Sequence, residues 1–342
     1  MKSHPREIIY GHSDPFLTGG AEMKGSVKFG WRVPTFPLDG SRGGIFRDQI
    51  YTYLDAIHGR FASAWVGDHF FVAWHEALDP MRDLLECWTM LAHLAGRYPE
   101  LLFGSMVVNQ SFRQPALLAK MAATLQTLAG GRFILGLGAG GVEDEHLAYG
   151  YDFPSDATRI HRMGEAAQIL RLMWTQPSTT FQGRFYHVQD AICEPKPDPP
   201  IPLCIGGGGP KLTLRYAAQY ADWWNWHSPL EGYSERLDLL RGHCEAVGRD
   251  YDSIVKTWAS ACVAVAPTSE EAQQIAEASL HYDPGFGYPI GWGSVVGTPD
   301  EVSAQLKEFA DLGVQHIILQ FADFPRTDSA VLFAEEVIPR FS

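Results

Sequence analysis

The feature that most constrains this chain is residues 132–145, where a strand-type apolar run leads directly into glycines. Such a strand is expected to end at a binding site, because glycine lets the backbone turn sharply and approach a ligand closely. Gly136, Gly138 and Gly141 match the G-x-G-x-x-G spacing of a dinucleotide fold. That fingerprint opens the first βαβ unit of its fold, whereas at least three strand candidates precede it here. The pattern therefore favours a β-barrel.

Strand-type and helix-type patterns alternate along the rest of the chain. Strands are predicted over residues 27–33, 62–66, 101–108, 133–137, 201–205, 221–226, 254–265 and 314–320. Helices are predicted over residues 46–58, 84–94, 114–128, 156–174, 210–220, 231–247, 269–280, 299–312 and 328–338. Eight strands, each followed by a helix, predict an α/β fold of the (β/α)8 TIM-barrel type, although an open doubly wound sheet would show the same alternation. Closure is favoured because the candidate sites below follow several different strands.

One barrel domain is expected over residues 27–342, with insertions near 175–200 and 281–297. The first insertion is expected to hold a small hairpin over residues 180–186 and a proline-rich connector over 194–202. Residues 1–26 form an N-terminal extension, expected to lie on the surface, to reach a partner subunit or to be disordered.

Charge and cysteine content limit the partners. With 27 Lys and Arg against 40 Asp and Glu the net charge is −13, which disfavours nucleic acid and anionic membranes, so an anionic ligand needs a local basic site. The five cysteines show no C-x-x-C spacing, so neither a disulfide framework nor a metal site is indicated.

The sequence shows neither the hydrophobic core of a signal peptide nor an apolar run long enough to span a membrane. A cytoplasmic protein without a membrane partner is expected.

The segment Gly206–Thr213 is the most specific local signal for a ligand. A buried strand is followed by four glycines, and Pro210 suits the first turn of a helix. The free N–H groups of such a turn and the helix dipole favour an anion, to which Lys211 and Thr213 could add a charge and a hydroxyl. The alternative is a flexible loop with a capped helix.

Other candidates are ionisable or aromatic. His69, after Gly67 and Asp68 at the end of the second strand, could donate a proton or a hydrogen bond near neutral pH. Trp74 and Trp226 could line a flat pocket for a ring cofactor, or could be simple core. Arg159 and Arg162 could reach a phosphate, or could be paired on a helix face.

Several ordered motifs carry a family resemblance. They are the segments 66–71, 104–107 with 112–113 and 115, 132–140, 194–197, and 206–209 with 213–215, 217–218 and 220–222. In this order they resemble the luciferase-like flavin monooxygenase and deazaflavin oxidoreductase superfamily, and within it the branch that uses coenzyme F420.

The resemblance implies a (β/α)8 barrel, often dimeric, that holds an isoalloxazine-type ring at the C-terminal mouth and acts on a small-molecule substrate. A bulge in the third strand is implied to back the ring, with a non-proline cis peptide at Met106–Val107. His69 matches a position of proposed catalytic importance in the deazaflavin sugar-phosphate dehydrogenases. The implied cofactor contacts are Asp68 and Asn109 at the ring, Gly138, Ala139 and Gly140 near its tail, and Gly207, Gly208, Gly209 and Thr213 at its phosphate.

The chain also departs from this pattern. Gly141 stands where those dehydrogenases carry an acidic residue, and their ring-proximal tryptophan has only an uncertain match in Trp74. Three functions therefore remain open. The first is hydride transfer between coenzyme F420 and a small organic substrate, the second is an FMN-dependent monooxygenase that uses reduced FMN and O2, and the third is a non-catalytic flavin-binding protein.

Overall fold

A computed structural model describes residues 26–73, 79–283, 285 and 288–341. Within this part of the chain, parallel strands run in the order β3-β2-β1-β13-β10-β9-β8-β5, and β3 also pairs with β5, so the sheet closes on itself. The barrel strands are β1 (Lys28–Val33), β2 (Ser63–Val66), β3 (Leu102–Ser105), β5 (Phe133–Gly138), β8 (Leu203–Gly206), β9 (Trp223–Trp226), β10 (Val255–Ala259) and β13 (His316–Leu319). The predicted (β/α)8 barrel is confirmed, and the open sheet is excluded.

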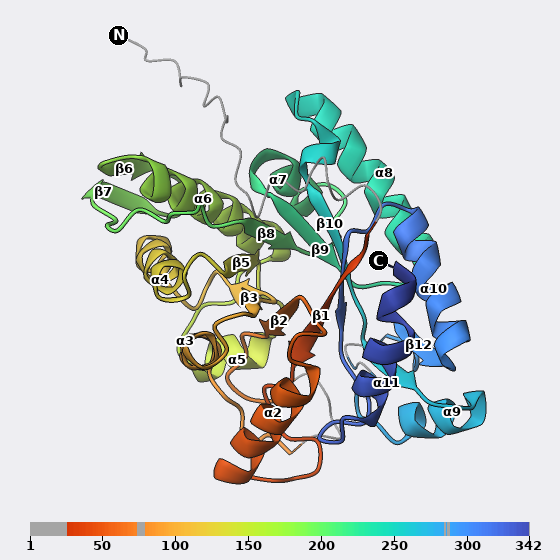
Figure 1. Cartoon of the computed structure of the whole chain (residues 1–342). Helices are drawn as coiled ribbons and strands as arrows, with labels where there is room; N and C mark the ends of the chain where they lie inside the picture. The colour runs from red at the N-terminus through yellow and green to blue at the C-terminus, as the bar shows by residue number, and fades with distance from the viewer. Residues whose placement is uncertain (1–25, 74–78, 284, 286–287, 342) are drawn as a thin grey trace.

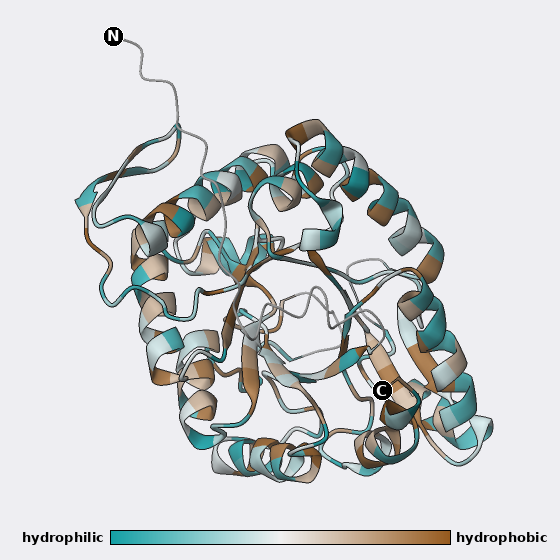
Figure 2. Cartoon of the chain, turned by 45° about the horizontal axis from the view of Figure 1, so that its top comes forward, coloured by the Kyte–Doolittle hydropathy of each residue, from teal (hydrophilic) through white to brown (hydrophobic). Residues whose placement is uncertain are grey.

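Helices surround the barrel, as Figures 1 and 2 show. They are α2 (Gly44–Ile57), α3 (Cys87–Arg97), α4 (Pro115–Leu128), α5 (Glu143–Ala148), α6 (Asp156–Thr175), α7 (Thr213–Tyr220), α8 (Leu230–Val247), α9 (Ser269–Glu277), α10 (Pro299–Asp311) and α11 (Asp328–Glu336), with short 3-10 turns at Tyr251–Ser253 and Ile338–Phe341. Several begin at a side-chain cap: Thr298 and Glu301 form a reciprocal capping box at α10, and Gln114 accepts two backbone N–H bonds at α4.

The alternation of side chains along the strands separates two cores. In β1, Phe29, Trp31 and Val33 are buried against the outer helices, while Gly30 and Arg32 lie on the barrel-facing side. The interior below the mouth is filled by a separate cluster of Trp65, Ile134, Cys204, Trp223, Ala259 and Ile318. The barrel interior is therefore a packed core below the cavity at its C-terminal end.

Two predicted strands are interrupted. The third is broken after Ser105 and resumes as β4 (Val108–Asn109), because a bulge intervenes. The predicted strand 254–265 divides into β10 and β11 (Cys262–Val265). Strand β11 leaves the barrel sheet and pairs in parallel with β12 (Ser294–Gly297), which lies inside the insertion expected over 281–297. Periodicity could not reveal this break, because buried residues continue from β10 through Ala261 into β11 and no polar, exposed segment separates the two strands.

The first insertion and two helices also differ from the predictions. The hairpin consists of β6 (Thr179–Gln182) and β7 (His187–Ala191), so most of the predicted hairpin 180–186 is its turn; it lies outside the ring of helices in Figure 1. Helix α5 was not predicted, and α7 begins at Thr213 rather than Pro210. Except for Ser26, the predicted extension 1–26 lies outside the described residues. No helix in the described part of the chain is both long and apolar enough to cross a membrane.

Candidate active site

A cavity of about 740 Å³ lies at the C-terminal mouth of the barrel, within the size range of small-molecule and cofactor sites. Its walls come from the ends of all eight barrel strands and from the loops that follow them. Most of the predicted site residues line it: Asp68, His69, Met106, Val107, Asn109, Gly138, Ala139, Gly140, Gly207, Thr213 and Trp226. Gly208, Gly209 and Lys211 are not among the lining residues, and Trp74 lies outside the described residues.

The bulge between β3 and β4 forms one wall of the cavity, and its Met106–Val107 peptide bond is cis, as the resemblance implied. The side chain of Val107 lies against three glycines. A Cβ atom added to Gly138 would lie 2.5 Å from Val107 Cγ2, and one added to Gly206 would lie 2.8 Å from Val107 Cγ1. Glycine is therefore required at these strand ends to accommodate the bulge, whatever ligand binds above it.

Two further glycine positions accommodate other side chains of the site. Gly140 has a positive φ of 80°, and a Cβ there would lie 2.5 Å from the amide of Asn109. A Cβ on Gly208 would lie 2.4 Å from the Trp226 ring. Because these two glycines have no side chain, the Asn109 amide and the Trp226 ring have room to pack against the turns beside the cavity.

The predicted anion site has a different geometry from the expected one. Pro210 is not in the first helical turn, because residues 210–212 form a separate turn and α7 starts at the buried Thr213. Lys211 is exposed in this turn, while Gly207 and Thr213 line the cavity. A phosphate contact by these residues stays a prediction.

Asp68 is held by the protein itself. Its carboxylate accepts two hydrogen bonds from the Arg113 guanidinium, at 2.7 and 3.0 Å, and one from the backbone N–H of Asn109 at 3.0 Å. Arg113 also donates to Glu86, which caps α3. The buried Asp68 carboxylate thus fixes the backbone after β2 to that after the bulge. Contact of Asp68 with a ring stays a prediction.

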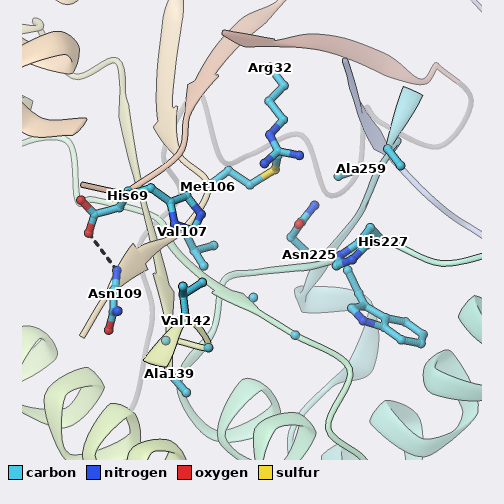
Figure 3. Close-up of a pocket in the computed structure, with 18 of the residues that line it drawn as sticks. Arg32, His69, Met106, Val107, Asn109, Ala139, Val142, Asn225, His227 and Ala259 are labelled. Atoms are coloured by element: carbon cyan, nitrogen blue, oxygen red, sulfur yellow. Dashed lines mark hydrogen bonds between the residues drawn. The ribbon is translucent and has the colours of Figure 1, made fainter. Parts of the chain in front are cut away.

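Asn109 is also bonded on both sides of its amide. Its Oδ1 accepts from the Ser111 N–H at 3.0 Å, and its Nδ2 lies 3.2 Å from Nε2 of the buried His146. His146 Nδ1 lies 2.7 Å from the carbonyl oxygen of Val142. The residue therefore has a fixed orientation in the cavity wall, where Figure 3 shows it.

His69 has an acidic partner that the sequence did not reveal. Its Nδ1 lies 2.8 Å from Oε2 of Glu145, and the other oxygen of Glu145 accepts the Phe70 N–H at 2.7 Å. The Glu145 side chain is 1% exposed, while that of His69 is 27% exposed and lines the cavity. Because a carboxylate only accepts, it keeps a proton on Nδ1 and fixes the imidazole ring in place. Position 141 lacks an acid, but α5 places one beside His69.

The wall opposite the glycine turns contains polar residues that the sequence analysis did not select. Arg32, His227, His281 and Gln320 line the cavity there. Burial first, and then the charge of Arg32, lowers the pKa of His227 to about 4 and that of His281 to about 3, so both rings are neutral near pH 7. The sequence signal that could have found Arg32 was a charged residue within an otherwise apolar strand pattern.

The two arginines considered for a phosphate are paired within the protein. Arg159 donates to the carbonyl oxygen of Gly140 at 3.1 Å and to Asp156 at 2.6 Å, and Arg162 makes two bonds to Asp152, at 2.9 and 2.8 Å. Among the described residues no group of three or more His, Cys, Asp or Glu side chains could hold a metal ion.

Residues 29–287 match the family described as luciferase-like monooxygenase. The chain is 27% identical over 323 residues to the F420-dependent glucose-6-phosphate dehydrogenase of Amycolatopsis mediterranei, covering 86% of this chain and 94% of the relative. The structure resembles an F420-dependent secondary alcohol dehydrogenase solved with an F420-acetone adduct, with a TM-score of 0.78, 20% identity and coverage of 93% and 99%. It also resembles a monooxygenase from Streptomyces bottropensis, with a TM-score of 0.76, 22% identity and coverage of 92% and 100%. Because both structural matches are below 25% identity, they show a shared fold and not a shared activity.

Proposed function

The chain belongs to the luciferase-like monooxygenase family, and we propose that within it the chain is an oxidoreductase that transfers hydride between coenzyme F420 and a small organic substrate. The relative from Amycolatopsis mediterranei named above is by name an F420-dependent glucose-6-phosphate dehydrogenase, which supports this proposal. The observation that carries the proposal in the structure is the His69–Glu145 pair beside the Met106–Val107 bulge in one cavity.

The residues present fit a flat ring cofactor with a phosphate-bearing tail. The bulge offers an apolar wall for a ring face, and the backbone at Gly140 and Gly207 has the positive φ that only glycine adopts easily. We assign the ring to Met106, Val107 and Asn109. The tail is assigned to Gly138, Ala139, Gly140, Gly207 and Thr213, which line the cavity, and its outer end to Gly208, Gly209 and Lys211 of the adjoining turn. Asp68 is the residue that fixes the ring-binding backbone.

Bound F420 would supply a carbon that accepts or gives up a hydride. The remaining chemistry belongs to the chain: removing a hydride from an alcohol requires that its hydroxyl proton also leave. His69 is the group for that proton, through the ring nitrogen that Glu145 does not hold. Glu145 stabilises the imidazolium that forms.

A second candidate is an FMN-dependent monooxygenase, favoured by the monooxygenase among the similar folds. Both candidates use the same ring site, so the fold does not separate them. A non-catalytic flavin-binding protein is a third candidate, and the His69–Glu145 pair disfavours it, since binding alone does not need an oriented acid–base group.

We further propose that the protein is a cytoplasmic homodimer that acts on a small-molecule substrate. Binding to nucleic acid or to a membrane is not proposed, in line with the net charge of −13.

The test is equilibrium binding of the purified protein to F420 and to FMN in parallel, followed by fluorescence. Tight F420 binding with weak FMN binding is expected, and F420 reduction would then be screened with glucose 6-phosphate and secondary alcohols. No affinity for F420 would refute the proposal. Preference for FMN together with oxygen consumption would establish the second candidate, and binding without any turnover the third.

A further inference from the structure

Arg32 occupies a distinct place in the cavity. It is the last barrel-facing residue of β1 and follows Trp31, which pairs with Leu319 at the end of β13. Gln320 is the first residue after β13. Figure 3 shows its guanidinium pointing into the cavity, with Met106 on one side and Asn225 and His227 on the other. The charge is therefore presented to a ligand in the cavity.

Within the described residues, Arg32 is the arginine lining this cavity that has no paired partner. Arg113 and Arg159 are each bound to a carboxylate at 2.7 and 2.6 Å, respectively. Arg32 makes no ion pair and no side-chain hydrogen bond with any residue in the described part of the chain. Desolvation alone lowers its pKa, to about 10, so it remains charged near pH 7. An unpaired, desolvated cation is costly, which makes a ligand that completes the pair energetically favoured.

The surroundings of Arg32 keep the local charge positive. His227 and His281 are near enough to feel its charge and are neutral at pH 7, so they add hydrogen-bonding groups without a second charge. The amide of Gln320 lies 2.8 Å from the His281 ring. Asp283 lines the same cavity, yet its carboxylate is beyond ion-pair distance of Arg32. An unpaired positive charge beside the neutral groups of His227, His281 and Gln320 is suited to binding a single anionic group.

This site lies across the barrel from the predicted phosphate site of the cofactor. In the closed sheet, β1 and β8 are separated by four strand steps in either direction, so Arg32 and the turn at Gly207 face each other across the mouth. A cofactor whose tail reaches the turn after β8 and whose ring lies on the Met106–Val107 wall leaves the Arg32 side for another molecule.

We propose that Arg32 anchors an anionic group of the substrate, a carboxylate or a phosphate monoester, with Gln320 and His227 as neutral hydrogen-bonding neighbours. That this anionic group belongs to a hydride-transfer substrate rests on the proposed function above. The binding of an anion at Arg32 does not depend on that function. An acid-bearing or phosphorylated alcohol anchored in this way would have its reacting carbon held between Arg32 and His69, both of which line the cavity.

The test measures binding of inorganic phosphate and of acetate by calorimetry at constant ionic strength, with and without saturating F420. The wild type is compared with Arg32→Met, Arg32→Lys and Arg184→Met. Arg184 is an exposed arginine on the hairpin turn, so Arg184→Met is a control that removes the same charge as Arg32→Met. Thr213→Val is included to remove anion binding at the cofactor's predicted phosphate site. Melting temperature and F420 affinity are recorded for every variant.

At least one of the two anions is expected to bind to the wild type, about tenfold or more weakly to Arg32→Met, with partial recovery in Arg32→Lys and no change in Arg184→Met. The preferred anion identifies the substrate class. Equal binding to wild type and Arg32→Met, loss only in Thr213→Val, or no binding of either anion would overturn the proposal. Failure of F420 to bind would refute the proposed function alone, because the measurements without cofactor still report on Arg32.

Discussion

The carboxylate of Glu145 lies 2.8 Å from Nδ1 of His69, although the two residues are 76 positions apart in the chain. The same carboxylate accepts the Phe70 N–H, so α5 and the loop after β2 are held together at the mouth of the barrel. A fixed imidazole in the cavity wall is what proton transfer requires, and a buried carboxylate is what fixes it.

Replacing His69 by alanine is expected to leave F420 binding intact and to lower turnover by about 10²-fold or more, because general acid–base catalysis contributes about 10²–10⁴-fold. Binding is measured by fluorescence and turnover by F420 reduction with the substrate identified in the screen. Unchanged turnover would assign His69 a structural role only.

Glu145→Gln is expected to lower kcat by about tenfold to a hundredfold, the range typical of a partner that orients a reacting group. An amide can still hydrogen-bond but does not stabilise the imidazolium, so the acidic limb of the pH–rate profile should shift while F420 affinity stays constant. The matched control is Glu143→Gln, an exposed residue of the same helix, which should behave as wild type. A variant whose melting point falls without a change in the pH profile would show that Glu145 acts only in folding.

Gly138→Ala is expected to destabilise the protein by about 1–3 kcal/mol, the usual cost of overpacking, because its Cβ would lie 2.5 Å from the stiff side chain of Val107. F420 affinity should fall as well, since the displaced bulge forms the wall assigned to the ring. Gly141→Ala is the control, because a Cβ there meets nothing within 4 Å. Urea unfolding checks both, and equal stability of the two variants would contradict the assigned role of Gly138.

Arg113→Met is expected to cost about 3–5 kcal/mol, because it leaves the buried carboxylate of Asp68 without its partner. Arg162→Met removes a pair with the exposed Asp152 and should cost about 0–1 kcal/mol. Urea unfolding at pH 7 compares the two, and similar losses would show that Asp68 finds other partners.

Stability should fall as the pH drops below 6.5. His316 is buried in the barrel, and desolvation lowers its folded-state pKa from 6.5 to about 3. Between these values the unfolded chain binds a proton that the folded chain does not, so stability rises with pH across this window and is constant above it for this group. His227 and His281 act in the same direction.

The urea midpoint at a series of pH values checks this dependence. His316→Gln should reduce the slope between pH 3 and 6.5, whereas His58→Gln, at an exposed histidine, should not. A slope that is the same in both variants would assign the acid sensitivity to other groups.

The sequence by itself determined the elements and the places where the chain turns toward a ligand. All eight barrel strands, the glycine turns after β5 and β8, and His69 at the end of β2 follow from alternation, glycine content and residue type, which act between near neighbours in the chain. The cis peptide at Met106–Val107 came from the family resemblance and is confirmed.

Only the tertiary structure decided which distant side chains share the cavity. Glu145 lies on a six-residue helix too short to leave a periodic signal, and Arg32 lies on a strand whose facing becomes known only when β1 pairs with β13 and β2. The partners of both are set by the closure of the barrel, which brings strand ends far apart in sequence to one mouth. Local patterns carry no information about such pairings, because hydrogen bonds and ion pairs depend on distances in space and not along the chain.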